Sequence, residues 1–407
     1  MKTVTDARIV AFAPALVAVS QVSTSIYLPA SPALVTVFDT STTMVQLTFT
    51  VYLIGAAFSQ LISGPLSDRF GRRPVLLGGL VLYVLASIAA AAATSIEALI
   101  VARVFQATGA MTGPVIGRAM IRDRFDRSRS AKALANVSLA LAVSPALAPL
   151  LGAFVFEAAG WRANFVLVAA FGLLMLVLAL GLLGETNRQR QIGAGPAELA
   201  GNYLKLLRSR AFLSYALPAA LLFGTMFTFL SEGPHVLITM MGMSPTAFAT
   251  YAALVACGFA VGSFASSRLT VRLGIDRMIA LGLIAAATGA AALVVVASTG
   301  ATSIVSLVAP MTVIVFGLGL VFPNGMAGAI SVHPEFAGTS SAMVGFLQMV
   351  FSALGTVVPE LFADGTELPM VLTVAAGVVL AGASFALKPG GLHAGPGQAP
   401  VGVRTAE

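Results

Sequence analysis

Charged side chains are scarce in this chain. They make up only 10% of its 407 residues, against 58% hydrophobic residues, and the mean hydropathy is +0.95. Soluble globular domains carry about 25% charged residues, because a water-exposed surface requires polar groups. The composition therefore excludes a soluble globule and predicts an integral membrane protein. Cysteine is scarcer still, since Cys257 stands alone, and this excludes an internal disulfide.

The hydrophobic residues form long runs separated by short polar breaks. A helix needs about 20 apolar residues to cross a bilayer, whereas a barrel strand needs about ten that alternate. The runs have helical length, so the predicted fold class is an all-α membrane protein with twelve transmembrane helices. They lie near residues 9–30, 43–63, 75–94, 98–119, 132–155, 163–184, 211–231, 247–267, 278–298, 303–325, 338–359 and 369–387. No small-residue cleavage site follows the first run, so we expect a retained helix and not a signal peptide.

Lysine and arginine are distributed unevenly over the predicted loops. If the N-terminus is cytoplasmic, all of them lie on the cytoplasmic side except Arg103, inside a run, and Arg162, in an outer loop. Basic residues are retained on that side of the membrane. The sequence therefore predicts a multi-pass inner-membrane protein with both termini in the cytoplasm. The net charge of +7 then reflects topology and anionic lipid headgroups, and we expect no nucleic-acid partner.

The chain also repeats itself weakly. A shift of 203 residues, about half the chain, aligns Arg69 and Gly71 with Arg272 and Gly274. The repeat predicts two pseudo-symmetric halves of six helices related by an axis along the membrane normal, with a binding site between them. The expected parts are a six-helix half at 1–184, a cytoplasmic linker at 185–210, a second half at 211–388, and a disordered tail at 389–407. Leu199, Tyr203, Leu206 and Leu207 have helical spacing, which favours an interfacial helix in the linker over a solvated one.

The segment from Gly64 to Pro74 concentrates four charges in one polar break. It resembles the GxLxDRxGRR signature that the major facilitator superfamily carries between its second and third helices. A basic cytoplasmic loop would explain the arginines but not Gly64, Asp68 and Gly71 at these spacings. The resemblance implies a latch for alternating access, formed by Gly64, Asp68, Arg69, Gly71, Arg72, Arg73 and Asp123. In this latch Asp68 would bind backbone N–H groups near residues 338–340, and Arg69 or Arg73 would pair with Asp123.

A narrower resemblance rests on three further runs. Residues 23–32 look like the TDxYLPxxP run of the Bcr/CflA-type drug exporters, a branch of the twelve-helix drug/proton antiporters. Residues 145–165 and 323–348 also match that branch. The resemblance implies that Pro145, Pro149 and Gly152 bend the fifth helix and let it pack closely against the other half. One position departs from the pattern: Ser25 stands where the branch has a protonatable aspartate, so cationic substrates are expected to be less favoured.

Two charged residues in the runs are candidates for coupling. Arg103 resembles the arginine of the family's RxxQGxG motif in the fourth helix. Because an intramembrane cation costs about 2.5–3.5 kcal/mol, we expect Arg103 to face the cavity, the alternatives being hydrogen bonds to carbonyls or snorkelling to an interface. Glu232 is a candidate titrating acid near the outer mouth, with a solvated helix-end carboxylate as the alternative. The other expected cavity residues are Tyr27, Ser25, Gln106, Asn136, Phe227, Asn324 and Gln348.

These patterns together indicate a proton-driven exporter of small lipophilic compounds. The chain lacks the GxxxxGK[ST] loop of ATP-driven pumps, and we expect no enzyme activity, cofactor or metal. The expected partners are a small-molecule substrate, protons and the lipid bilayer, and the chain is expected to act as a monomer. Two alternatives remain: an exporter of a physiological solute such as a sugar, dipeptide or amino-acid derivative, and a non-transporting membrane sensor.

Overall fold

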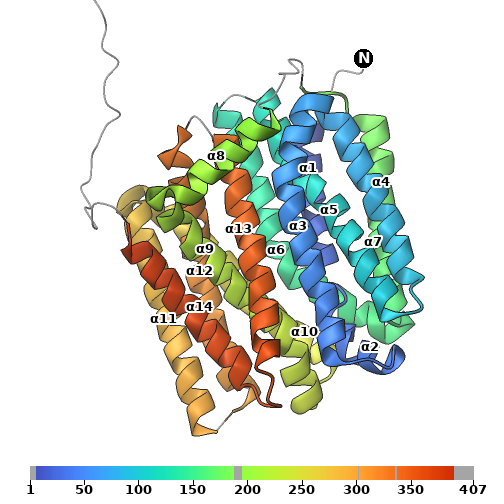
Figure 1. Ribbon diagram of the computed structural model, residues 1–407, viewed down its shortest axis with the longest axis vertical. Helices are drawn as coiled ribbons and strands as arrows, with labels where there is room; N and C mark the ends of the chain where they lie inside the picture. Colours follow the sequence, from blue (N-terminus) through green and yellow to red (C-terminus); the bar gives the residue numbers. More distant parts are fainter. Residues whose placement is uncertain (1–5, 126, 188–194, 301, 335–336, 389–407) are drawn as a thin grey trace, which may run out of the picture.

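The computed structural model describes residues 6–125, 127–187, 195–300, 302–334 and 337–388, and within these ranges it contains helices but no strands (Figure 1). The first group comprises α1 (Asp6–Ser25), α2 (Ser31–Val37), α3 (Thr42–Phe70), α4 (Arg72–Ala91), α5 (Ile96–Arg124), α6 (Arg127–Ala159) and α7 (Trp161–Leu182). The second group comprises α9 (Arg210–Gly233), α10 (Pro245–Leu273), α11 (Ile275–Thr299), α12 (Ile304–Val332), α13 (Ala337–Leu361) and α14 (Leu368–Ala386). Between them lies α8 (Pro196–Arg208), and the short turns η1 (Leu28–Ala30) and η2 (Pro234–Met240) follow α1 and α9. The tail at 389–407 lies outside the described residues.

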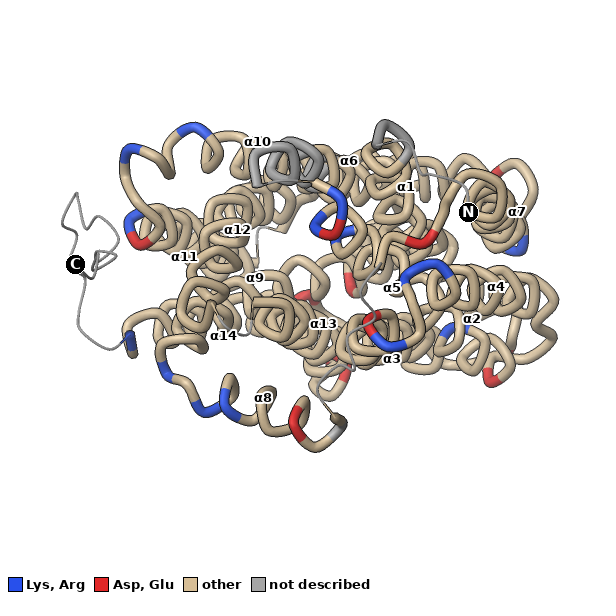
Figure 2. The backbone as a smooth tube through the Cα atoms, turned by 90° about the horizontal axis from the view of Figure 1, so that it is seen from above, with Lys and Arg blue, Asp and Glu red and all other residues tan. Residues whose placement is uncertain are grey.

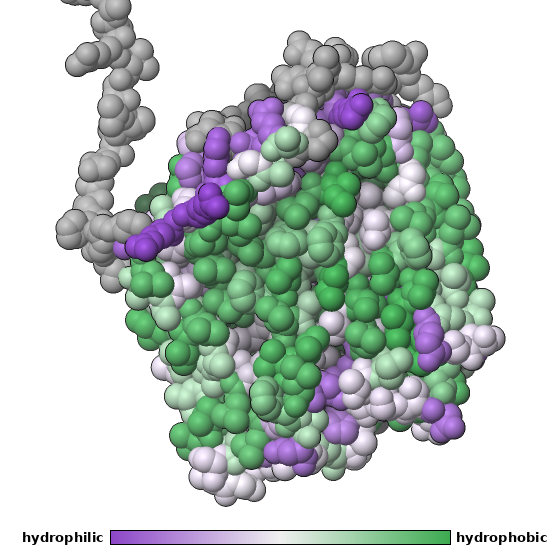
Figure 3. Space-filling model, viewed as in Figure 1, coloured by the Kyte–Doolittle hydropathy of each residue, from purple (hydrophilic) through white to green (hydrophobic). Residues whose placement is uncertain are grey.

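The helices have the length and the surface of membrane spans. Eleven described helices are long and apolar enough to cross a bilayer, and a shorter apolar stretch, Val143–Ala159, lies within α6. Their outer surfaces expose large side chains such as Phe58, Leu85 and Phe154. Figure 3 shows a broad belt of apolar side chains between polar ends. Because a water-facing surface does not carry so large an apolar area, the belt faces lipid and the predicted all-α membrane fold is confirmed.

The two groups of six long helices lie side by side (Figures 1 and 2) and use equivalent contacts. Gly55 of α3 packs against the Val104 carbonyl of α5, where an added Cβ would lie 3.0 Å from the oxygen. Gly258 of α10, 203 positions later, packs against the Thr312 carbonyl of α12, at 2.6 Å by the same measure. Small residues allow two helix backbones to approach closely. The repeat therefore marks the same helix crossing in both halves.

Two predicted boundaries were wrong. The second run was expected to end at residue 63 and give way to a loop, but α3 continues through Pro65 to Phe70. Only Gly71, with a φ of 103°, interrupts the chain before α4 begins at Arg72. The first run was expected to be one helix over 9–30, but α1 ends at Ser25 and the chain passes through η1 into α2. Pro29 and Pro32 begin these two short helices, because proline is favoured in a first turn and lacks the N–H that continues a helix.

We call the end of the bundle that carries α8 and the α3–α4 turn the linker face, and the end that carries α2 the opposite face (Figure 1). On the linker face, α8 buries Leu206 against Phe212 and Val344 of the second half. Its Tyr203 hydroxyl donates a hydrogen bond of 3.1 Å to the Leu61 carbonyl of α3 in the first half. That carbonyl is free because Pro65, four residues later, has no N–H. Tyr203 thus joins α8 to α3 at an acceptor that a proline has released.

Replacing Tyr203 by Phe should therefore lower the free energy of unfolding by about 1 kcal/mol, because a half-buried acceptor loses its donor. In a Pro65→Ala background the same replacement should have almost no effect, since the new alanine then supplies the N–H. A double-mutant cycle of unfolding in detergent measures the difference. Equal losses in the two backgrounds would show that Tyr203 acts through packing alone.

Candidate functional site

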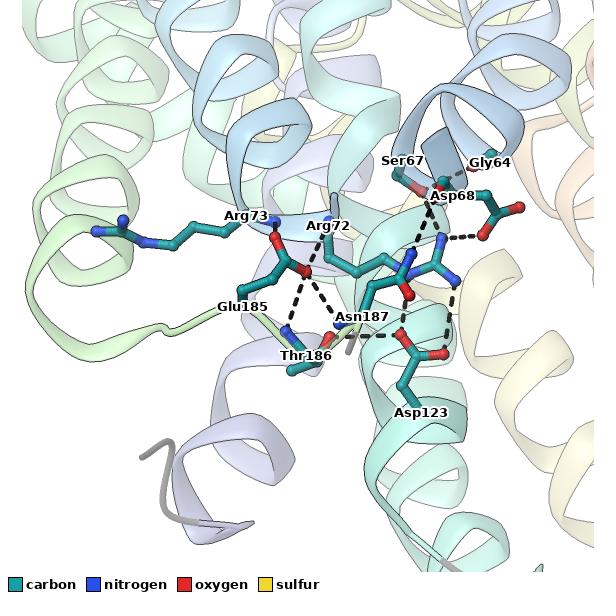
Figure 4. Close-up of polar contacts among 9 residues, drawn as sticks. All are labelled: Gly64, Ser67, Asp68, Arg72, Arg73, Asp123, Glu185, Thr186 and Asn187. Carbon is teal, nitrogen blue, oxygen red and sulfur yellow. Dashed lines mark hydrogen bonds and ion pairs between the residues drawn. The ribbon is translucent and has the colours of Figure 1, made fainter. Parts of the chain in front are cut away.

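The linker face carries a network of charged and polar residues that we call the linker-face cluster: Ser67, Asp68, Arg72, Arg73, Asp123, Glu185, Thr186 and Asn187 (Figure 4). Arg72 lies at its centre and is buried. Its guanidinium donates to Asp123 of α5 at 2.9 Å and 3.5 Å and pairs with Asp68 of α3 at 2.5 Å. It also donates to the Ser67 hydroxyl at 2.7 Å. The planar guanidinium can bind a carboxylate on each side, so one side chain joins the ends of α3, α4 and α5.

The pairing expected within this segment was partly wrong. Asp123 does bind an arginine of the motif, but the arginine is Arg72 and not Arg69 or Arg73. Asp68 pairs with Arg72 in place of the start of α13. Arg69 lies over the Phe70 ring, and Arg73 donates to the Leu180 carbonyl. The reason is the continuation of α3 to Phe70, because only Gly71 then separates the end of α3 from Arg72 at the start of α4, and Asp68 lies four residues before Arg72.

Glu185 is a member of the cluster that the motif did not indicate. Its carboxylate accepts backbone N–H groups from Arg72 at 2.9 Å and Arg73 at 3.2 Å, and it also accepts those of Thr186 and Asn187. Gly71, the N-cap of α4, has no side chain to bind these N–H groups. A carboxylate from after α7 therefore caps α4 and lies at the positive end of its dipole. A Cβ at position 71 would lie 2.5 Å from a Glu185 oxygen, so glycine is required there for space as well as for its φ.

In the second half, the position equivalent to Glu185 carries a residue of the opposite charge. The shift of 203 places Lys388 at the position of Glu185 and Asp276 at that of Arg73. Lys388 pairs with Asp276 at 2.5 Å, and Asp276 accepts a hydrogen bond of 2.8 Å from Tyr215. Burial would lower the pKa of Lys388, but its bonds to Asp276 and Tyr215 outweigh this and raise the pKa above the ordinary value. Lys388 therefore stays protonated at every physiological pH.

Arg103 is fully buried inside the first half and does not line the cavity described below, contrary to expectation. Its guanidinium donates to the Ser23 carbonyl at 3.0 Å and to those of Thr24 and Thr48 at 3.4 Å. It donates a further bond of 2.7 Å to Gln106, which in turn donates to Ser87. Its carbon Cζ lies 4.0 Å from the ring centroid of Tyr52 and 4.6 Å from that of Tyr27. Within the described residues Arg103 forms no ion pair.

The position of the α1 break explains this arrangement. Because α1 ends at Ser25, its last carbonyls have no helical partners and form the negative end of the helix dipole. Arg103 donates to the carbonyls of Ser23 and Thr24 at this end, and the aromatic faces add cation–π attraction. A cation without a carboxylate is thus compensated by backbone dipoles. The structure supports the alternative interpretation of Arg103, in which it binds carbonyls.

A narrow cavity of about 20 Å³ lies where the two halves meet. It is lined by Gln21, Thr24, Ser25, Leu141 and Pro145 from the first half and by Phe223, Met226, Phe227, Leu230 and Phe259 from the second. Phe223 packs against Phe259 and Phe322, and Phe227 stacks on Phe49 of α3 at 5.7 Å. The lining contains polar groups on α1 but no charged side chain. It is therefore an aromatic and aliphatic surface with one neutral polar wall.

Two of the expected cavity residues, Ser25 and Phe227, line this cavity. Tyr27 and Gln106 contact Arg103 instead, while Asn324 joins α10 to α12 through Ser266 and Thr270. Gln348 is buried on α13 and Asn136 is exposed on α6, and neither is in the lining. Phe223 and Phe227 are one helical turn apart, and this spacing was a signal in the sequence for the aromatic side of the cavity.

Glu232 is buried in α9, farther toward the opposite face.

Gly152 and Pro145 of α6 have different surroundings. Pro145 lines the cavity. A Cβ on Gly152 would overlap the carbonyl oxygen of Ile26, directly after the α1 break. The close approach that Gly152 allows is therefore to the chain after α1 within the same half, while α6 also packs against α10 of the other half, as expected. Gly64, by contrast, has only Val115 within contact distance of an added Cβ, at 3.9 Å.

Comparison with known proteins places the chain in a family. The family model of the Major Facilitator Superfamily matches residues 15–356. The chain belongs to this superfamily of membrane transporters. Among curated relatives it is 31% identical to the chloramphenicol resistance protein of Pseudomonas aeruginosa, over 85% of this chain and 82% of the relative. It is 27% identical to the bicyclomycin resistance protein homolog of Haemophilus influenzae, over 87% and 89%. It is 28% identical to multidrug resistance protein D of Escherichia coli, over 88% and 90%.

Solved structures agree on the fold. The crystal structure of a D-xylose-proton symporter superposes with a TM-score of 0.75 at 15% identity, covering 94% of this chain and 98% of that one. A bacterial homolog of the human lysosomal transporter Spinster superposes with a TM-score of 0.72 at 16% identity, covering 94% and 96%. At such identities the likeness concerns the arrangement of the helices alone.

Replacing Glu185 by Ala should lower the free energy of unfolding by about 1–3 kcal/mol, because the first N–H groups of α4 lose their acceptor. Glu198→Ala, in the first turn of α8 and outside the linker-face cluster, is the matched control and should change it by less than about 0.5 kcal/mol. Thermal unfolding in detergent measures both. Identical melting curves for Glu185→Ala and wild type would contradict the capping role.

Replacing Arg103 by Met should lower the free energy of unfolding by about 3–5 kcal/mol, since three carbonyls and Gln106 lose a buried cationic donor. Arg103→Lys should recover little of this, because a single ammonium cannot reach all of these acceptors. Arg162→Met is the control: Arg162 lies over Trp161 and donates to the Ala93 carbonyl, but it is not fully buried. A stable Arg103→Met protein with impaired transport would restore a direct role in coupling.

Proposed function

We propose that this chain exports small lipophilic compounds of drug or antibiotic type across the inner membrane by alternating access, driven by proton entry. The observation that supports this most is the cavity between the halves, with an aromatic wall from α9 and α10 and no charge in its lining. Small-molecule sites are mostly apolar with a few polar groups that fix orientation. Gln21, Thr24 and Ser25 are placed to supply those groups on one wall.

The cavity also supports a preference in substrate charge. Ser25 introduces no carboxylate into the lining, so a lipophilic cation would find no countercharge there. A neutral compound buries its apolar surface without this cost. The relatives named for chloramphenicol and bicyclomycin resistance support compounds of antibiotic type as the first to test.

Alternating access requires contacts at both ends of the bundle that break in turn. Toward the linker face, Gln60 of α3 donates a hydrogen bond of 3.2 Å to the Gly345 carbonyl of α13. Toward the opposite face, Thr50 and Thr356 share one of 2.7 Å, and Thr43 donates to Glu360. A drug-sized site has a volume of about 300–1,000 Å³, far above the cavity described. Binding therefore requires the halves to separate at one end, which breaks one of these two sets.

The proposal assigns sides to the two ends. We place the linker face in the cytoplasm, because the α3–α4 turn on this face carries Arg69, Arg72 and Arg73. The basic residues of α8, blue in Figure 2, lie on the same face. Both termini are then cytoplasmic, and the two halves act as rigid units joined by residues 185–210. The linker-face cluster would hold the ends of α3, α4 and α5 together as the first half moves. A single chain contains both halves of the cavity, so the proposed unit of transport is a monomer.

The test is transport in proteoliposomes with a defined pH gradient. Wild type should accumulate chloramphenicol inside vesicles whose lumen is acidic, because proton exit then drives drug entry, and collapse of that gradient by an ionophore should abolish accumulation. Phe223→Ala with Phe227→Ala should raise the KM by about tenfold, since the substrate loses about 1.4 kcal/mol of aromatic contact. Phe154→Ala, on the lipid-facing surface, is the matched control and should leave the KM unchanged. Transport that is independent of the proton gradient would contradict proton driving. An unchanged KM in the double variant would contradict the cavity as the substrate-binding site.

A further inference from the structure

Glu232 is a buried acid near the opposite end of α9. It is 7% exposed, and its Oε1 atom has no hydrogen-bond partner within the described residues. Two further buried oxygens close to it lack partners as well, Oγ of Ser231 and Oε1 of Gln46. Gln46 belongs to α3 of the first half, and its side chain interacts with the Glu232 carboxyl. A contact between the two halves therefore contains three buried side-chain oxygens without a partner in the described part of the chain.

The charges around this acid do not compensate it. The carboxylate of Glu360, from α13, is the charged group that acts on Glu232 electrostatically. The helices α12 and α14, which pack against α9, contain no charged residue, and the nearest base along the chain is the half-buried His235 of η2. An ionised Glu232 is thus a buried anion beside a second anion. Burying an unpaired charge costs several kcal/mol in real proteins.

A proton on Glu232 would address both the uncompensated charge and the unpartnered oxygens. It neutralises the buried charge, and it converts one carboxyl oxygen from an acceptor into a donor, close to the Gln46 Oε1 atom that lacks one. The same contact lies among those that close the opposite face: Glu360 accepts from Thr43, and Thr50 and Thr356 share a hydrogen bond. Separation of the halves at this face would bring water to Glu232 and favour its ionised form.

We propose that Glu232 is a proton-binding site at the contact between the halves, and that protonation of its carboxyl closes the opposite face. The inference rests on the proposed export function, for which it names the coupling group, and it places that group in the second half of the chain. Release of the proton leaves two neighbouring carboxylates, Glu232 and Glu360, whose repulsion favours opening. Glu232 then takes up a proton from the compartment on the side of the opposite face, and this allows closure.

The closing motion can be measured without any substrate. In a Cys257→Ser background, Val37→Cys on α2 and Ala363→Cys after α13 place two spin labels at exposed positions on the opposite face. Electron–electron distances are recorded over a pH series. The distance in the protein that retains Glu232 should shorten as pH falls, and Glu232→Gln, a neutral isostere of the protonated acid, should hold the short distance at every pH.

Two matched variants separate Glu232 from its neighbours. Glu360→Gln removes the second carboxylate and should shift the transition to lower pH, because repulsion no longer opposes ionisation of Glu232, without abolishing it. His235→Asn should leave the transition in place. If Glu232→Gln keeps the pH-dependent distance, or if His235→Asn removes it, Glu232 is not the site and the proposal is overturned.

A second measurement applies if Glu232→Gln changes the fold. Infrared difference spectra of wild type between low and high pH should contain a protonated-carboxyl C=O band that is absent from Glu232→Gln and present in Glu360→Gln. Persistence of the full band in Glu232→Gln would overturn the assignment.

Two outcomes distinguish the proton site from the export function. A pH-dependent closure without chloramphenicol transport would contradict the export function but not the proton site. Proton-driven transport at the wild-type level by Glu232→Gln would leave export standing and remove Glu232 from it.

Discussion

A helix that stops inside a membrane leaves carbonyls that no water can reach, and these must be satisfied by the protein. Here α1 stops at Ser25, and Arg103 donates to the carbonyls at its end. The rest of the first half depends on this contact. Tyr27 and Tyr52 stack on the guanidinium, and Gly152 lets α6 approach the chain directly after the break. The residues that end α1 then become the polar wall of the cavity.

The same requirement organises the linker face. Pro65 releases the Leu61 carbonyl, which Tyr203 of α8 binds, and Gly71 leaves α4 without a side-chain cap, which Glu185 supplies. In each case a backbone group freed by a proline or glycine is bound by a side chain from a different helix or from the chain beyond it. Breaks in the helices are therefore the points at which distant segments are joined, and this explains why the interruptions of the sequence and the polar contacts coincide.

The two halves share their backbone and differ in their charges. Glu185 and Lys388 occupy equivalent positions 203 residues apart, yet one caps a helix through backbone N–H groups and the other forms an ion pair with Asp276. Most acids of the described residues have a partner. Within the described residues Glu232 is the one carboxyl that has a buried oxygen without a partner. The partly buried carboxylates of Asp123 and Glu185 have their partners, so an unpartnered carboxyl oxygen marks a place that a proton would satisfy. This supports a coupling site in α9.

The amino-acid sequence by itself determined the class of the protein. Twelve apolar runs of bilayer length, the repeat, and the motif from Gly64 to Pro74 sufficed for the fold and the superfamily, because hydrophobicity and local spacing are properties of short segments. It could not decide the partners of the polar residues, since these come from helices far apart in the chain. The hydropathy of its run is the same whether Arg103 faces a cavity or a row of carbonyls. Likewise, the motif does not show which of its arginines pairs with Asp123. Only the tertiary structure decided these contacts, because the break of α1 at Ser25 and the extension of α3 to Phe70 set which groups lie within hydrogen-bond distance.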